Sequence, residues 1–163
     1  MIDYGGRAGA LLGRIRAQSW FVRLWFLPVW ALLGVCRMAI LTLKFERVAR
    51  LLGKRMAIPS RRLECVNPAQ AKRAREISRV IQSASLRTPW DSNCFTQAVA
   101  ARAILAFYGM PCVVIFGIAR SKTDGKRLAH AWVETAGIRV TGGKRGQQYA
   151  FLGAFGSHDP DRA

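Results

Sequence analysis

A helix that ends abruptly and is followed at once by strands is the feature that most constrains the fold of this chain. Apolar side chains recur at helical spacing from Phe95 to Leu105. Gly109 and Pro111 mark the end of this helix, because glycine adopts the left-handed cap and proline cannot continue the pattern. The expected elements are a helix over residues 94–108, strands over 112–119, 128–135 and 138–141, a polar loop over 120–127, a turn at Ala136-Gly137 and a last short strand over 149–152. This order predicts an α+β fold in which a helix is followed by antiparallel strands.

Cys94 and His130 occupy positions that suit a nucleophile and its base. Ser92 or Asn93 is a suitable helix cap, so Cys94 falls in the first turn, where free backbone N–H groups and the helix dipole favour a thiolate. Strand alternation puts His130 on one face with Leu128, Trp132 and Glu134. An imidazole that takes the thiol proton and later protonates a leaving amine would complete a thiolate–imidazolium pair. The alternative is that both residues are structural, as cysteines in apolar helices and single strand histidines commonly are.

The residues around this pair resemble a known family. The sequence resembles the leader peptidases of lasso-peptide biosynthesis, which also form the C-terminal domain of fused maturation proteins, within the transglutaminase-like (papain-like) cysteine enzymes. The resemblance covers about the last two thirds of the predicted core, and the basic, aromatic N-terminal region is similar as well. The residues that carry it are Trp90 and Ser92 before Cys94, Tyr108-Gly109-Met110-Pro111, Gly117, and Ala129-His130-Ala131-Trp132-Val133-Glu134 followed by Gly137.

The resemblance implies a function and a set of partners. It implies a cysteine peptidase that cleaves the leader from a ribosomally made precursor, with Cys94 as nucleophile and His130 as general base and then acid. The freed N-terminal amine would be used by a separate ATP-dependent lasso cyclase, and a separate small protein would recognise the leader. No cofactor and no metal are implied. The rival interpretations are an acyltransferase on the same Cys/His fold and a non-catalytic scaffold of the maturation complex.

One departure from the family leaves the third catalytic group open. Members often place an Asp on the strand after the histidine, near residues 141–143 of this chain, but no carboxylate lies between Glu134 and Asp159. Asp91 is better interpreted as a charge at the helix start, and Glu134 is a strand neighbour that rarely bonds such an imidazole. A backbone carbonyl or a side-chain amide is the remaining option for holding the imidazole tautomer.

The rest of the chain divides into a helical region and a tail around the predicted core. The expected divisions are a helical, basic and aromatic N-terminal region over residues 1–66, the catalytic core over 67–155 and a flexible tail over 156–163 that contains an inert His158. Within the core, Asn67-Pro68 predicts the start of a helix that reaches Ser85 and buttresses the helix bearing Cys94. In the N-terminal region, residues 44–62 form a basic amphipathic segment with apolar residues at helical spacing, and Gly53 and then Pro59 mark its end. Its basic face is either solvated or a docking surface for an acidic partner.

Residues 20–43 form a strongly apolar run that allows several interpretations. A transmembrane helix needs about 20 apolar residues, but Arg37 would cost ~2.5–3.5 kcal/mol inside the membrane. A signal peptide would need a cleavage site of small residues, which is absent after Leu43. We therefore expect a pair of helices hinged at Pro28 that packs on the core or on a partner, with peripheral membrane contact as the alternative.

Charge and cysteine content bear on nucleic-acid binding, metal binding and cellular location. Lys and Arg outnumber Asp and Glu by 26 to 9, a net charge of +17 that favours adventitious contact with nucleic acid or anionic lipid whatever the function. The tryptophans fall in apolar runs and no nucleic-acid recognition module is visible, so no specific nucleic-acid binding is expected. A zinc site needs three or four ligands, and the two histidines and four cysteines are widely spaced in the sequence, which argues against such a site. The cysteines, Cys36, Cys65, Cys94 and Cys112, are expected to be reduced thiols in a cytoplasmic, alternatively membrane-associated, protein.

Overall fold

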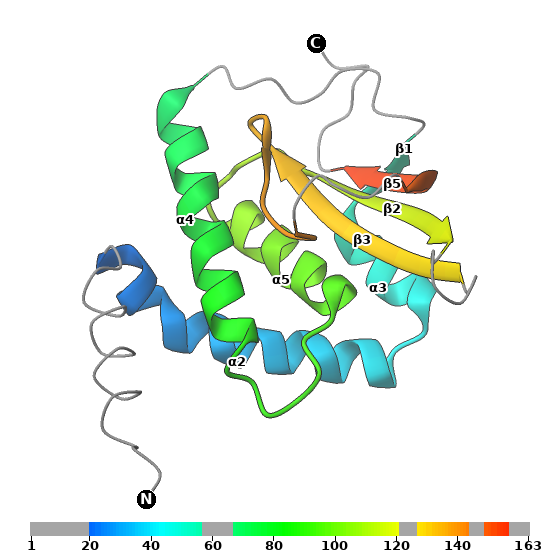
Figure 1. Ribbon diagram of the computed structural model, residues 1–163, viewed down its shortest axis with the longest axis horizontal. Coiled ribbons are helices and arrows are strands. Elements are labelled where there is room, and N and C mark those ends of the chain that lie inside the picture. Colours follow the sequence, from blue (N-terminus) through cyan, green and yellow to red (C-terminus); the bar gives the residue numbers. More distant parts are fainter. Residues whose placement is uncertain (1–19, 57–66, 121–126, 144–148, 157–163) are drawn as a thin grey trace, which may run out of the picture.

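The computed structural model describes residues 20–56, 67–120, 127–143 and 149–156, and the chain folds as an α+β domain. In these ranges helices gather below and beside one five-stranded sheet (Figure 1). The helices are α2 (Trp20–Thr42), α3 (Phe45–Leu52), α4 (Pro68–Ser85) and α5 (Cys94–Phe107), and the strands are β1 (Lys54–Met56), β2 (Val113–Arg120), β3 (Arg127–Thr135), β4 (Ile138–Arg139) and β5 (Ala150–Gly156).

The apolar run near the N-terminus forms one helix that packs on the core. The predicted hinge at Pro28 is wrong, because α2 continues through this residue from Trp20 to Thr42. Proline removes one helical hydrogen bond, but Val22, Val29 and Leu33 on either side are buried, and α2 packs against both α4 and α5. Tertiary packing therefore holds the helix together where the local sequence predicts a break. The predicted packing of this run on the core is confirmed.

The ends of α4 and α5 follow the caps expected from the sequence. Oδ1 of Asn67 accepts a hydrogen bond from the Ala69 N–H at 2.9 Å, and Pro68 occupies the first turn of α4. The predicted apolar stripe of α4 is buried, and the helix packs against α5 as expected. After α5, Gly109 has a φ of +62°, which confirms the left-handed termination.

The sheet has the order β1-β5-β2-β3-β4 and is antiparallel throughout (Figure 1). The predicted hairpin is confirmed, since Ala136 and Gly137 both have positive φ and join β3 to a short β4. The last strand expected over residues 149–152 is present as β5, but it is longer and runs to Gly156, the first residue of the predicted tail. The edge strand Lys54–Met56 and the insertion of β5 between β1 and β2 were not predicted. Several predicted features lie outside the described residues. They are residues 1–19, residues 57–66 with Cys65, the central part of the polar loop (121–126), the segment 144–148 and the tail beyond Gly156 with His158.

The two faces of β3 belong to different hydrophobic clusters. Ala131 and Val133 pack in the main core together with buried residues of α2, α4 and α5. Trp132 belongs to a smaller cluster with Val113, Ile115 and Ala154. Because side chains alternate along a strand, His130 lies on the Trp132 face of β3.

Candidate active site

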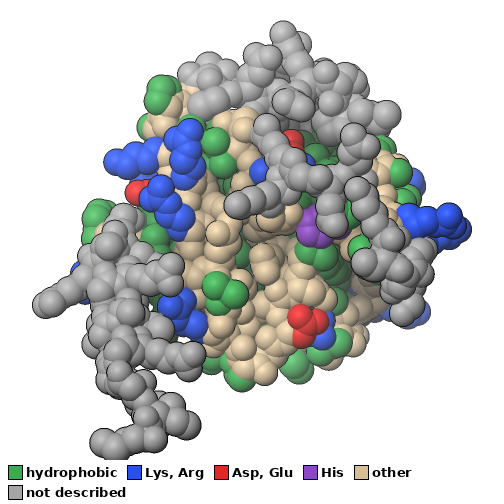
Figure 2. All heavy atoms as spheres, viewed as in Figure 1, with side chains coloured by type: hydrophobic (Ala, Val, Ile, Leu, Met, Phe, Trp, Pro, Cys, Tyr) green, Lys and Arg blue, Asp and Glu red, His purple; other side chains and the backbone are tan. Residues whose placement is uncertain are grey.

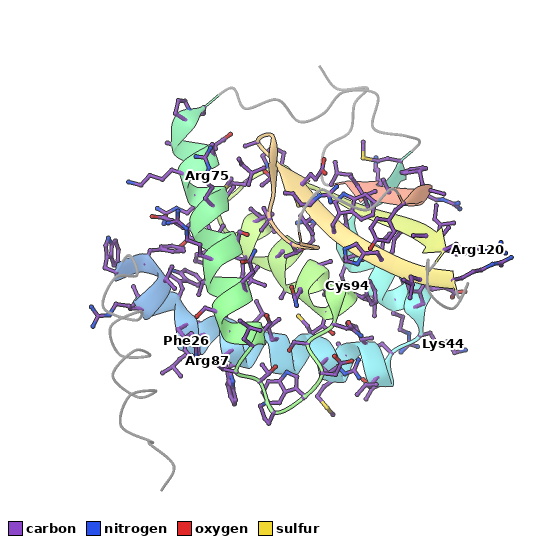
Figure 3. The ribbon with its side chains drawn as sticks, in the orientation of Figure 1. Phe26, Lys44, Arg75, Arg87, Cys94 and Arg120 are labelled. Carbon is purple, nitrogen blue, oxygen red and sulfur yellow. The ribbon has the colours of Figure 1, made fainter. Side chains whose placement is uncertain are left out.

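Cys94 is the first residue of α5, and its position is fixed by the cap of that helix. Figure 3 shows Cys94 at the start of α5. Of the two predicted caps, Asn93 is the one used: its Oδ1 accepts hydrogen bonds from the backbone N–H and the hydroxyl of Thr96, at 3.0 and 3.1 Å. The Cys94 side chain is half-buried and its thiol is free. A thiol at this place lies next to backbone donors of the first helical turn, which can stabilise negative charge.

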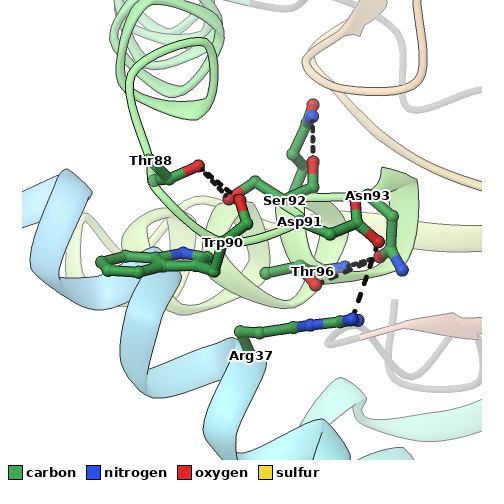
Figure 4. Close-up of polar contacts among 8 residues, drawn as sticks. Arg37, Thr88, Trp90, Asp91, Ser92, Asn93 and Thr96 are labelled. Carbon is green, nitrogen blue, oxygen red and sulfur yellow. Dashed lines mark hydrogen bonds and ion pairs between the residues drawn. The ribbon is translucent and has the colours of Figure 1, made fainter.

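The segment that leads into Cys94 is held by a compact set of polar contacts (Figure 4). The hydroxyl of Thr88 donates to the carbonyl of Trp90 at 3.0 Å and lies 2.9 Å from the hydroxyl of Ser92. Gln97, one turn into α5, donates from Nε2 to the carbonyl of Ser92 at 2.8 Å. The backbone before the thiol is therefore tied both to the preceding turn and to α5.

Helix α2 supports the same segment from the other side. The rings of Trp30 and Trp90 have centroids 4.8 Å apart, and a Cβ at Gly34 would lie only 2.9 Å from Cζ2 of Trp90, so the glycine leaves room for this indole. Asp91 forms an ion pair with Arg37 of α2 at 3.6 Å (Figure 4). The sequence did not predict this ion pair between Asp91 and Arg37.

His130 is held by a backbone carbonyl. Its Nε2 lies 2.8 Å from the carbonyl oxygen of Gly142. Because a carbonyl only accepts, this hydrogen bond requires the proton on Nε2 and leaves Nδ1 as the acceptor of the neutral ring. Glu134 does not take this role, since its Oε1 accepts from Trp132 Nε1 at 3.2 Å and from Arg139 Nη2 at 3.3 Å. Of the options left open by the sequence, the backbone carbonyl is the one found beside the imidazole.

The geometry at Gly142 excludes a side chain from this position. Its φ of +89° lies in the left-handed region, which favours glycine. A Cβ there would also clash with the Cβ of Trp132 and lie 3.0 Å from Nε2 of His130. An Asp at residue 142 would not fit this backbone, and the carbonyl of Gly142 lies beside the imidazole instead of the carboxylate that the resemblance led us to expect.

Aromatic rings enclose the imidazole on the Trp132 face of β3. The ring of Tyr149 stacks on His130 with a centroid distance of 4.8 Å and an interplanar angle of 20°, and the Trp132 ring lies at 6.0 Å. Gly117, which pairs with His130 across the strands, makes room for both rings: a Cβ there would be 2.7 Å from the Tyr149 Cβ. Strand alternation could have identified Trp132, but no local signal marks Tyr149 or the Gly142 carbonyl.

The structure places Cys94 and His130 on neighbouring elements without a hydrogen bond between them. Helix α5 packs against β3, yet its contacts involve the face of Ala131 and Val133, whereas the imidazole lies on the other face. Within the described residues, no hydrogen bond joins the Cys94 thiol to the imidazole. The catalytic dyad therefore stays a prediction. The described residues also contain no group of three His, Cys, Asp or Glu side chains that could hold a metal ion.

The family of the chain follows from a comparison with family models. The model of the transglutaminase-like superfamily matches residues 39–153, which is more than half of the chain and includes both Cys94 and His130. The chain therefore belongs to the transglutaminase-like superfamily. This superfamily includes cysteine peptidases and acyltransferases, and its members are often cysteine-dependent enzymes. No curated protein and no solved structure matches the chain.

Proposed function

We propose that this chain is a cysteine peptidase that cleaves the leader from a lasso-peptide precursor, with Cys94 as nucleophile and His130 as general base and acid. The observation that carries the proposal is the 2.8 Å contact between Nε2 of His130 and the Gly142 carbonyl. It supplies the tautomer and orientation that a general base needs, at the place where relatives use a carboxylate. The match of the superfamily model across both residues supports the same assignment.

The proposed chemistry has two steps. Nδ1 of His130 takes the proton of the Cys94 thiol, and the thiolate attacks the carbonyl carbon of the scissile peptide bond. The C–N bond then breaks, the imidazolium gives its proton to the leaving amine, and the leader is left as a thioester on Cys94. A water molecule, losing its proton to His130, hydrolyses this thioester and restores the thiol. The free N–H groups at the start of α5 face the developing oxyanion.

This chemistry requires the thiol and the imidazole to come together on the enzyme. Catalytic hydrogen bonds are often long or misaligned without substrate and tighten only in the complex. The imidazole is held at Nε2 by the Gly142 carbonyl and on its face by the stacked Tyr149 ring, whereas the thiol can rotate about the Cα–Cβ bond of Cys94. We propose that an extended precursor, bound across the start of α5 and the edge of β3, brings the two groups into contact.

The proposed partners are the precursor leader, a separate leader-recognition protein and a lasso cyclase that uses the freed amine. The test is intact-mass analysis of a cognate precursor incubated with the recognition protein and this chain, without the cyclase. Native chain, Cys94→Ala and His130→Ala are compared, and Cys36→Ala serves as a control that removes a different thiol. Leader and core fragments formed only by the native chain and the Cys36→Ala control support the proposal. An uncut precursor in every sample, with folding verified separately, contradicts it.

A non-catalytic scaffold is the second candidate, and one observation favours it. The described residues hold no thiol–imidazole hydrogen bond and no carboxylate at the imidazole. A scaffold would bind the precursor or the cyclase without cutting the precursor, and substitution of Cys94 would leave assembly of the complex unchanged. The same mass analysis identifies an acyltransferase, since transfer of the acyl group to an added amine gives a product heavier than the hydrolysis product.

A further inference from the structure

The outer face of α2 carries an uninterrupted apolar stripe. At steps of three or four residues the side chains remain exposed, with Trp20 at 74 %, Leu24 at 62 % and Leu27 at 72 % of their full areas. The stripe continues along the whole helix through Ala31, Val35, Met38 and Leu41. Arg23 is the one charged residue among the exposed side chains of α2. A contiguous apolar surface of this length on a folded domain marks a place of contact with something else.

The opposite face of α2 is part of the hydrophobic core. Phe21, Val29 and Leu33 are buried against α4 and α5, and the guanidinium of Arg73 lies 4.5 Å from the centre of the Phe21 ring. By length and composition α2 is able to cross a membrane. To do so, however, it would have to leave α4 and α5 and expose their apolar faces. The packed helix can therefore offer only one face to lipid.

Basic side chains lie beyond the C-terminal end of α2 and beside the helix, where they outnumber the exposed acids Glu46 and Asp91. Lys44, Arg47 and Arg50 are exposed just beyond the C-terminal end of α2, and Arg87 lies beside the helix with its guanidinium 5.7 Å from the centre of the Phe26 ring. Figure 3 shows Lys44 and Arg87 close to α2, and Figure 2 shows few acidic side chains among the Lys and Arg on the viewed face. The whole chain carries a net charge of +17. An apolar stripe with a basic border is complementary to an anionic bilayer, where acyl chains lie beneath acidic headgroups.

A shallow apolar hollow lies on the same side of α2. It has a volume of about 690 Å³ and is lined by Trp30, Gly34, Val35, Met38 and Trp90, among others. Tryptophan is favoured at the boundary between headgroups and acyl chains, because one part of the ring is apolar and the N–H is polar. Trp20 at the start of the helix is exposed and occupies a position suited to this boundary, whereas Trp30 lines the hollow and donates its N–H to the carbonyl of Arg87 at 3.1 Å.

We propose that α2 docks this protein onto the surface of an anionic phospholipid bilayer. The helix lies in the plane of the interface, its outer stripe enters the acyl boundary and its inner face remains in the protein core. Because α2 also supports the segment before Cys94 through Trp90 and the Arg37–Asp91 ion pair, docking brings this segment close to the membrane surface. The proposal does not depend on the peptidase assignment.

The test is flotation of the full chain with vesicles of neutral phosphatidylcholine or with vesicles containing about one third phosphatidylglycerol. We expect binding to the anionic vesicles and weakening of this binding at high salt. The double variant Leu24→Gln/Leu27→Gln should weaken it by at least about tenfold, because it removes two side chains that would enter the acyl boundary. Leu152→Gln is the matched control, since Leu152 is 56 % exposed but lies on β5; its binding should equal that of the native chain.

A charge-matched pair of variants tests the basic border. Lys44→Gln/Arg87→Gln and Arg75→Gln/Arg120→Gln each remove two exposed positive charges, but Figure 3 shows Arg75 on α4 and Arg120 at the end of β2, away from α2. The first pair should weaken anionic binding more than the second. Equal effects of the two pairs, or unchanged binding of the leucine variant, would overturn the proposal in favour of non-specific attraction.

Two further results would assign the stripe to another occupant. A dimer in sedimentation velocity that Leu24→Gln/Leu27→Gln converts to monomer, without any vesicle binding, would assign it to a second copy of the chain. Resistance of the bound chain to extraction with alkaline carbonate would indicate a spanning helix rather than a docked one.

Discussion

Substitution of Gly142 by alanine tests whether the backbone at this residue is what positions His130. Gly142 has a φ of +89°, and an added Cβ would clash with the Trp132 Cβ and approach Nε2 of His130 to 3.0 Å. The left-handed backbone costs an alanine about 1–2 kcal/mol, and forced overpacking typically costs about 1–3 kcal/mol. The free energy of unfolding should therefore fall by about 2–5 kcal/mol in Gly142→Ala.

Substitution of Gly143 by alanine is a control, because Gly143 also has a positive φ but an added Cβ there would meet no neighbouring atom. Its φ is +70°, and a Cβ there would have no atom within 4 Å. Gly143→Ala should cost only the backbone term of about 1–2 kcal/mol. The effect of a glycine on the entropy of the unfolded chain is common to both variants, so the difference between them isolates the contact with Trp132 and His130.

The measurement is urea denaturation of the two variants and the native chain, followed by precursor cleavage under conditions in which all three are folded. Gly142→Ala should be less stable than Gly143→Ala by about 1–3 kcal/mol. If His130 is the general base as proposed, the cleavage rate of Gly142→Ala should also fall by about a hundredfold, because displacement of a catalytic group by about 1 Å has an effect of this size. Equal stabilities and equal rates for the two variants would refute the role assigned to the Gly142 backbone.

Three further predictions concern the thiols, the helix cap and a buried hydroxyl. Burial raises the pKa of the Cys36 thiol from 9.0 to about 11, so the neutral thiol stabilises the fold below pH 9 and this contribution is lost as the pH rises towards 11. At neutral pH the buried Cys36 should therefore react with iodoacetamide well after Cys94, which peptide mapping can measure. Equal alkylation rates of the two thiols would argue against a reactive Cys94. Asn93→Ala should lower the free energy of unfolding by about 1 kcal/mol and also slow precursor cleavage. Asn67→Ala, which removes the equivalent cap of α4, should lower stability without slowing cleavage. An unchanged cleavage rate in Asn93→Ala would show that the cap of α5 does not affect catalysis. Thr141 is 3 % exposed and its hydroxyl has no hydrogen-bond partner among the described residues, so Thr141→Val should raise the melting temperature, with stability higher by about 1 kcal/mol, and a lower value would reveal a partner for the hydroxyl.

Local signals were sufficient to predict most of the secondary structure. Asn67-Pro68 and Asn93 begin helices because their side chains accept the first free N–H groups, and Gly109 ends one because it tolerates a positive φ. The alternation in residues 128–135 correctly put His130 and Trp132 on one face of β3. The hinge expected at Pro28 failed because the local cost of proline is smaller than the packing of α2 on the rest of the core.

The contacts around the imidazole could be read only in part from the sequence. A backbone carbonyl was one of several partners left open, and any residue has one, so the sequence contains no pattern that selects Gly142. Tyr149 reaches His130 because β5 inserts beside β2 with a register shift at Phe116 and Gly117. The exposed stripe of α2 has the same origin, since the sequence shows an apolar helix on all sides and only packing shows which side is buried.

By itself the sequence determined the α+β class, the boundaries of most helices and strands, and the place of Cys94 at the start of α5. These features depend on caps, turns and periodicity within about a dozen neighbouring residues. Only the tertiary structure decided the strand order, the edge strand β1, the carbonyl that holds His130 and the face of α2 that remains exposed. Such features arise from contacts between segments distant in the chain, where packing and backbone path, rather than local preference, select the partner.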